Sequence, residues 1–420
     1  MMRFRWIFIV SIVMHSMTTY AMIFDNQYWP LFPEKFLSTQ TLPDARFYWD
    51  LRGVLLGADA AYINDEDDPV GSDEAVTFSQ IFGDYDEQEI DRALQLSGRT
   101  TSSLLPPGLM NTKLPWLIPG KSSLRGLAFE FELFPHKNFG IGGSIFAGHM
   151  HAETNSIFIN QNGFFSPNEV VELRTANAAM REALGVTPGI AHKGVFGDMD
   201  LYLHGRIRRY YWHTIHRFEV GLRFGTLIPT AARTSIINPV GLTIGGDGHL
   251  GLYGQLDTEL LLKDLMTVGF SLQVIKRLAK TAIHRMPVET EPTNYGALVG
   301  SARVNPGVTL AFYPYVQVGG LRDGLGLIGA YYLVWHATDH WSIPACANLP
   351  AKPNTCLLEK RSKWGSDHFS VGAFYDFGFE REACWHTPII SLTIDIPWHG
   401  PVTQMVPKSH GISLRIESRI

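Results

Sequence analysis

The chain has 420 residues, of which 45% are hydrophobic, 12% aromatic and only 18% charged, with 40 glycines and a formal net charge of −5 at pH 7. Soluble domains average nearer a quarter charged residues, so this composition is typical of strands and turns rather than of ordinary soluble domains. An excess of acids gives no reason to expect a nucleic acid as partner. By length alone the chain could form two or three soluble domains, but one large barrel with long loops uses the same number of residues.

The first residues predict export. Two arginines precede the apolar run Trp6–Met14, and small residues lead up to Ala21, as in secretory signals. We therefore expect a signal peptide at residues 1–21, cleaved after Ala21. A membrane anchor is the alternative, but about nine apolar residues are less than half of the ~20 that a spanning helix needs. Residues 22–46, which follow, are interpreted as an N-terminal segment that could form a short plug.

In ten or more stretches from residue 47 onward, apolar and polar residues alternate one for one. Between 195 and 208, apolar residues alternate with Asp198, Asp200, Arg206 and Arg208, and side chains with this period lie on opposite faces of a strand. The first segment changes phase near Gly53, where we expect a β-bulge. The pattern predicts strands at about 47–62, 122–134, 137–152, 194–209, 214–228, 248–263, 266–277, 304–319, 322–341, 363–379, 385–397 and 410–420.

The connectors between these segments alternate in length. Five are short, whereas the gaps 63–121, 153–193, 229–247, 278–303 and 342–362 are long and 398–409 is intermediate. Alternate turns of an antiparallel barrel lie at the same end, so this parity predicts tight turns at the periplasm and long loops outside. The predicted fold is all-β: a transmembrane antiparallel up-and-down β-barrel at 47–420, of about twelve strands (range 12–14).

Two long loops contain helix signals. Ser166 and Glu169 form a capping box with Pro167 at the first helical position, and that helix is expected to end at Gly185. Asp86 similarly begins a run that ends before Gly98. We interpret these short helices as a lid over the barrel mouth; a docking surface for another protein is the alternative.

The charged side chains that alternation places inside the barrel are the candidate functional residues. Charged rows in a pore set its selectivity, and facing acidic and basic walls would orient a dipolar solute. The alternative is that they pair with one another and block a narrow barrel. The predicted pore-lining residues are Asp50, Arg52, Glu130, Glu132, Asp198, Asp200, Arg206, Arg208, Arg217, Glu219, Arg223, Asp257, Glu259, Asp376, Asp395, Arg415, Glu417 and Arg419.

Metal, cofactor and disulfide signals are few. His149 and His151 share a face, as two metal ligands should, but they continue a lipid-facing row and nothing completes a ligand shell, so we expect neither a metal nor a cofactor. In an exported chain, Cys346 and Cys356 of one polar connector are expected to form a disulfide. Cys384 is assigned no function.

Catalytic signals are weaker than the barrel pattern, and we expect no enzyme. His368 and Ser370 have the H-x-S form of outer-membrane phospholipases and share a face with Asp376, but that face is lumenal and Val371, not Asn, follows the serine. Asp339-His340 and Asp367-His368 are similar to the Asp-His pairs of outer-membrane proteases. Adjacent residues of a strand point to opposite faces, which argues against such a site.

In its signal, turn parity and inward charges, the chain resembles outer-membrane barrels of Gram-negative-type cells, the class of porins and substrate-specific channels. The segment 221–230, GLRFGTLIPT, is similar to a strand end in hydrocarbon and fatty-acid uptake barrels, a resemblance that implies fourteen strands and an N-terminal plug. Those barrels usually end in an aromatic residue, where this chain has Ile420.

The sequence therefore predicts an outer-membrane channel or transporter for passive or facilitated passage of a small solute, with the lipid bilayer as its other partner. A structural or adhesive barrel with a blocked lumen is the first alternative and an outer-membrane hydrolase the second. Association into a homo-oligomer is left open.

Overall fold

The computed structural model describes most of the chain from residue 46 onward and three residues near the N-terminus. The described residues are 26–28, 46–63, 76–83, 85–107, 116–117, 120–154, 157–158, 165–187, 189–211, 213–263, 265–345, 347–378 and 388–419. The predicted signal peptide, 1–21, lies outside them, as does most of the predicted plug.

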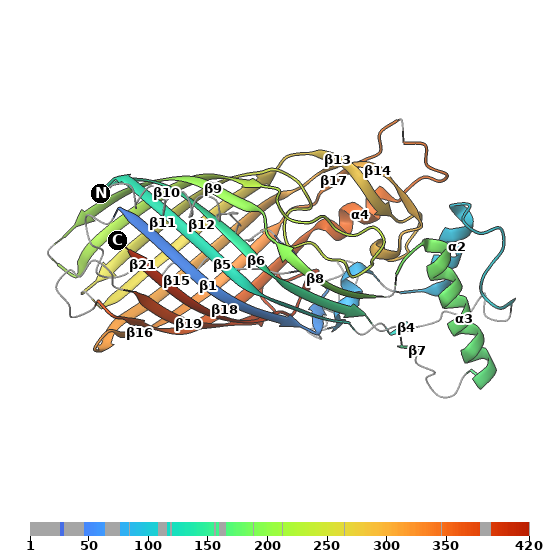
Figure 1. The fold of residues 1–420 in the computed structure, drawn as a ribbon, viewed down its shortest axis with the longest axis horizontal. Coiled ribbons are helices and arrows are strands. Elements are labelled where there is room, and N and C mark those ends of the chain that lie inside the picture. Colours follow the sequence, from blue (N-terminus) through green and yellow to red (C-terminus); the bar gives the residue numbers. More distant parts are fainter. Residues whose placement is uncertain are drawn as a thin grey trace, which may run out of the picture.

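Twelve antiparallel strands close into a barrel, which confirms the predicted fold and strand count (Figure 1). Closure comes from β1, which pairs with β21 on one side and β5 on the other, so that the first and last strands leave no open edge. The wall strands are β1 (Phe47–Ala58), β5 (Gly120–His136), β6 (Phe139–Thr154), β9 (Met199–Tyr210), β10 (Ile215–Ile228), β11 (Gly251–Leu262), β12 (Met266–Arg277), β15 (Val308–Arg322), β16 (Leu325–His336), β18 (Trp364–Asp376), β19 (Ile389–Trp398) and β21 (His410–Arg419).

The predicted strand 194–209 is interrupted. β8 (Ile190–Phe196) and β9 are separated by Gly197 and Asp198, and the two pieces pair with successive parts of β6. Only β9 continues to pair with β10. Beyond the break, at the loop end, the described part of this strand therefore pairs with β6 and no longer with β10.

The predicted bulge near Gly53 is wrong. β1 keeps an unbroken register with both neighbours, so Asp50, Arg52, Val54 and Leu56 all point inward and are buried. What changes at Gly53 is the chemistry of the inner face, from charged to apolar. The strand also ends earlier than predicted, because β2 (Ala60–Tyr62) belongs to a separate small sheet with β3 (Val76–Thr77) and β20 (Val406–Pro407).

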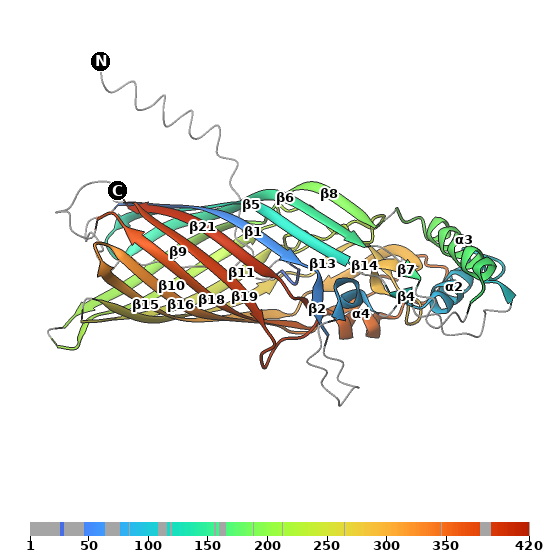
Figure 2. The same cartoon turned by 90° about the horizontal axis from the view of Figure 1, so that it is seen from below.

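Short turns lie at one end of the barrel and long loops at the other, hereafter the turn end and the loop end (Figures 1 and 2). The predicted alternation is thus confirmed, although two turns are displaced. The β5–β6 turn is centred on Lys137 and Asn138. The β15–β16 turn is centred on Asp323 and Gly324, and both of these residues have positive φ.

The two predicted loop helices are present. α3 (Pro167–Leu184) is capped by Ser166 and ends at the left-handed Gly185, and α2 (Glu87–Leu96) is capped by Asp86. They pack on each other through a buried cluster that Tyr295 and Ala297 complete. The cluster extends beyond the barrel at the loop end (Figure 1). Among the described residues, no helix has both the length and the apolar character to cross a membrane.

The guanidinium of Arg285, on β13 (Lys280–Met286), holds three loops together. It donates to the carbonyl oxygens of Ile236 at 2.9 Å, Gly296 at 2.7 Å and Leu184 at 3.1 Å. Burial, together with the nearby Arg99 guanidinium, lowers the pKa of Arg285 to about 10, which still leaves the group charged at neutral pH. The positive charge lies at the C-terminal end of α3, where the helix dipole favours a cation.

Loop residues also fill the outer half of the barrel. The 3₁₀ helix η1 (Phe78–Phe82) and residues 240–244 pack against inward side chains of β1, β5, β6 and β8. This apolar cluster includes Leu56, Leu124, Phe146 and Met150, with Phe78 fully buried among them. It explains why the inner face of β1 becomes apolar beyond Gly53.

Candidate transport site in the barrel lumen

The outer surface of the barrel is apolar, as a lipid-facing surface must be. Leu222, Leu252 and Leu392, from three separate strands, are 49%, 50% and 50% exposed, while their sequence neighbours on the inner face are buried. Burying such side chains in a protein core would be the normal outcome in a soluble domain. The alternation thus separates a hydrocarbon-facing surface from a polar lumen.

The predicted pore-lining charges point into the barrel and are buried or half-buried there; of the set, only the side chain of Arg419 is outside what the structure describes. In a wide water-filled pore such side chains would be exposed. Their burial shows that side chains and loops fill the lumen at these levels.

A first ion-pair cluster lies near the turn end where β1 meets β21. Arg415, 2% exposed, forms ion pairs with Asp50 at 2.9 Å and Glu417 at 3.1 Å. It also donates a 2.7 Å hydrogen bond to the Tyr48 hydroxyl, which in turn donates to Glu417. One guanidinium therefore compensates two buried carboxylates, a condition for such charges to be tolerated.

A second cluster joins β9, β10, β11 and β15. Arg208 pairs with Glu219 at 2.6 Å, and Arg217 pairs with Glu259, which also accepts a 3.1 Å hydrogen bond from the hydroxyl of Tyr315. The Arg217–Glu259 pair is almost completely buried.

A third cluster crosses from β10 to β5, strands that are not neighbours in the sheet. Arg223 lies 4.0 Å from the Tyr202 ring centre and 3.2 Å from a carboxylate oxygen of Glu130, to which the Tyr202 hydroxyl donates at 2.7 Å. Beside them, His204 and Glu132 are 2.6 Å apart. The acidic and basic strands are therefore joined by ion pairs instead of facing each other across an open pore.

Inward tyrosines are the feature that the sequence reasoning missed. Tyr313 stacks on Tyr332 at 4.3 Å and on Tyr315 at 5.3 Å, and all three are buried. Tyr253 donates to Asp200 at 3.0 Å. Their positions on the polar face of each strand were the available signal, because a tyrosine that alternates with lipid-facing residues must place its hydroxyl in the lumen.

A cavity of about 340 Å³ lies among the loops at the loop end, within the size range of small-molecule sites. Its wall combines rings and aliphatic groups with polar side chains. The lining includes Tyr28, Phe82, Trp341, Trp364, Arg233 and His284.

The described part of the N-terminal segment, Asn26–Tyr28, contributes to this cavity. The Asn26 amide donates to the carbonyl oxygens of Thr243 at 3.1 Å and Gly245 at 3.4 Å, and Gln27 donates to that of Met405 at 2.6 Å. Asn26 is 3% exposed. Part of the predicted plug segment thus lies at the loop end, whereas β1 begins at the turn end.

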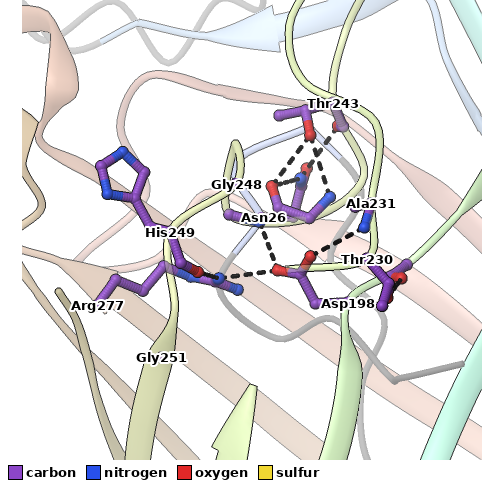
Figure 3. A network of polar contacts seen from close by, with 12 residues as sticks. Asn26, Asp198, Thr230, Ala231, Thr243, Gly248, His249, Gly251 and Arg277 are labelled. Atoms are coloured by element: carbon purple, nitrogen blue, oxygen red, sulfur yellow. Dashed lines mark hydrogen bonds and ion pairs between the residues drawn. The ribbon is translucent and has the colours of Figure 1, made fainter. Parts of the chain in front are cut away.

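Asp198, at the break between β8 and β9, holds the loop 229–250 in the barrel (Figure 3). Its carboxylate accepts from the Gly246 N–H at 2.8 Å and the Ala231 N–H at 3.2 Å, and it pairs with Arg277 at 2.8 Å. Arg277 also donates to the carbonyl oxygen of His249 at 2.8 Å. Asp198 was predicted to line a pore; the structure shows it anchoring a loop.

The catalytic candidates occupy other environments. His368, 1% exposed, hydrogen-bonds Ser366 at 3.0 Å and Ser409 at 3.2 Å and 3.3 Å, and these contacts do not join it to Ser370. Asp367 accepts from Tyr331 and Thr403.

In the second Asp-His pair, Asp339 and His340 also contact different residues rather than each other. Asp339 binds His336 at 2.9 Å, and His340 pairs with Glu359 at 2.8 Å. Among the described residues no group of three or more histidine, cysteine or acidic side chains is arranged to hold a metal ion. Cys356 is exposed, and Cys346 and Cys384 lie outside the described residues, so the disulfide stays a prediction.

Comparisons with known proteins agree on the architecture. No family model matches the chain, and no curated protein matches it. Among solved structures, a COG4313 outer-membrane channel from Pseudomonas putida F1 is similar with a TM-score of 0.50 and 9% identity, covering 92% of this chain and 100% of that one. A TodX deltaS2S3 mutant monoaromatic hydrocarbon channel and a Pseudomonas aeruginosa FadL homologue are each 10% identical, cover 96% of this chain and 98% of their own, and have TM-scores of 0.36 and 0.32. The similarity to the COG4313 channel therefore supports the fold of an outer-membrane β-barrel.

Proposed function

We propose that the protein is an outer-membrane channel that passes a small solute through a narrow lumen closed at rest. The observation that carries the proposal is the 340 Å³ cavity at the loop end, which opens among polar and aromatic groups above a lumen filled by paired charges. A general pore would expose its inner charges to water, so the filled lumen favours a selective, gated passage.

In this proposal, the chain is exported by residues 1–21, and the long loops face outward. The solute first occupies the cavity and then passes the clusters around Arg223 and Arg415, whose ion pairs exchange partners as it moves. The amphipathic lining of the cavity favours a compact solute with both a ring or aliphatic part and a polar group.

Asn26–Tyr28, which line the cavity, are proposed to act as the gate. Asn26 makes two hydrogen bonds to loop carbonyls, and at roughly 1 kcal/mol each their loss would shift a closed-to-open equilibrium by roughly thirtyfold. Purified protein in a planar bilayer with KCl tests this. Wild type should give small or rare conductance steps, and Asn26→Ala should open more often.

Asn138→Ala is the matched control, because Asn138 is an exposed asparagine in the turn at the opposite end; it should behave as wild type. The other reading, a structural barrel with a blocked lumen, is favoured by the same buried ion pairs. It predicts no conductance from wild type or from Asn26→Ala, and that result would overturn the channel proposal.

A further inference from the structure

A basic patch lies on the lipid-facing side of the wall at the loop end. It is formed by outward side chains of β5, β6 and β8, which lie side by side there (Figures 1 and 2). The register brings Arg125 beside His149 and His151 beside His192. The basic patch consists of Lys121, Arg125, His149, His151 and His192.

Contacts within the patch position Lys121, His151 and His192. The rings of His151 and His192 stack at 4.1 Å, with their Nδ1 atoms 2.9 Å apart. Glu153 pairs with Lys121 at 2.9 Å and with His151 at 3.3 Å. One acid is thus shared by two bases, and the patch keeps an excess of basic groups.

Arg125 carries the uncompensated charge. It is exposed on the outer face, and in the part of the chain that the structure describes its guanidinium has no hydrogen bond or ion pair. The next outward row toward the turn end is apolar: Leu127 is 56% exposed and Phe196 is 46% exposed. On β5 and β8 the patch therefore begins one row beyond the exposed apolar side chains Leu127 and Phe196, near the level expected for lipid headgroups.

The height of the wall supports this placement. β5 and β6 have 17 and 16 residues and are the longest strands of the barrel, and β5 begins at Gly120, beyond the Ser122 that pairs with the last residue of β1. The patch spans three successive outward rows, each about 6.6 Å apart along the strand. With the usual strand tilt this corresponds to roughly 10 Å along the membrane normal, somewhat more than the roughly 5–8 Å of one headgroup layer.

We propose that the basic patch binds the phosphate groups of a phosphorylated lipid in the leaflet that surrounds the loop end. Guanidinium and ammonium groups form charge-assisted hydrogen bonds with phosphate oxygens, and basic side chains at a membrane surface attract anionic lipids. The acyl chains of the bound lipid would lie on Leu127 and Phe196. This inference rests on the proposed membrane placement, with the loops outward, but not on transport.

The test uses native mass spectrometry of the purified full-length chain in detergent, titrated with diphosphoryl lipid A, with the dephosphorylated lipid and with inorganic phosphate. The patch variant is Lys121→Ala/Arg125→Ala/His192→Ala. The matched control replaces two arginines and a histidine at the turn end: Arg209→Ala/His213→Ala/Arg322→Ala.

Binding of diphosphoryl lipid A should weaken by at least roughly tenfold in the patch variant and stay near wild type in the control. Binding of the dephosphorylated lipid should be equally weak in all three. Equal lipid A affinity for wild type and patch variant would overturn the proposal, and inorganic phosphate binding as tightly as lipid A would overturn the assignment to a lipid.

Two further measurements keep the result interpretable. Far-ultraviolet circular dichroism checks that the variant retains its β-sheet, and the single variant Arg125→Ala serves if the triple variant does not fold. Conductance of the patch variant should equal that of wild type, because the patch faces away from the lumen. A failure of the channel proposal would therefore leave the lipid result standing.

Discussion

Replacing Asp198 by alanine should free the loop 229–250 while leaving the barrel folded. Asp198 is 1% exposed, and its carboxylate is the acceptor for two loop N–H groups and the partner of Arg277 (Figure 3). Removing one member of a buried ion pair costs about 3–5 kcal/mol, because the remaining charge is left in a poorly solvated site.

The cost should appear as local opening. The loop can move outward and let water reach Arg277, whereas the wall is held by continuous strand pairing on both sides of β9. At the lower limit of about 3 kcal/mol, the open population of the loop rises by roughly a hundredfold. Trypsin cleavage after Arg233, which is exposed within this loop, follows that population when opening is fast.

The assay is limited trypsin digestion in detergent, with cleavage after Arg233 identified by mass spectrometry and the denaturant midpoint measured in parallel. Asp59→Ala, a change of an exposed acid at the loop end, is the control and should be cleaved at the wild-type rate. Wild-type cleavage of Asp198→Ala together with a lower denaturant midpoint would refute the argument, since the carboxylate would then stabilise the wall rather than the loop.

Three other changes test separate parts of the structure. Leu222→Arg places a charge on the lipid-facing surface and should lower the free energy of unfolding by about 2–4 kcal/mol in lipid vesicles, measured by denaturant titration; no loss would contradict the membrane placement. Arg217→Met leaves Glu259 buried and unpaired and should cost about 3–5 kcal/mol, whereas adding Glu259→Gln should recover most of the loss; a double variant as unstable as the single one would argue against the pair. Ser166→Ala should destabilise α3 by about 1 kcal/mol, seen as faster amide exchange in that helix alone, and unchanged exchange would show that packing rather than the cap holds it.

The wall of the barrel could be predicted from the sequence because each strand residue has only two environments. Leu222 and Leu252 had to face lipid, and Asp50 and Glu259 had to face the lumen, so the period of two was sufficient. The turn between the predicted strands 304–319 and 322–341 lies instead at Asp323-Gly324, although Asp-Gly is a strong two-residue turn signal.

The interior could not be predicted in the same way. Alternation gives the face of a residue but not its partner, so nothing in the local sequence connects Arg223 to Glu130 or Arg277 to Asp198, which come from distant segments. The phase change at Gly53 was misread for a related reason. Inward apolar residues such as Leu56 contradict a polar lumen unless a loop helix is known to pack against them.

The three carbonyl contacts of Arg285 have a consequence for variation among related chains. Leu184, Ile236 and Gly296 belong to separate connectors, and each would ordinarily accept insertions without regard to the others. Because all three carbonyl oxygens accept from the Arg285 guanidinium, a connector can change in length only where its carbonyl contact with Arg285 is kept. Loss of that cation would weaken all three attachments at once and leave the connectors joined by the hydrogen bonds Thr187 to Ile237 and Asn294 to Pro239.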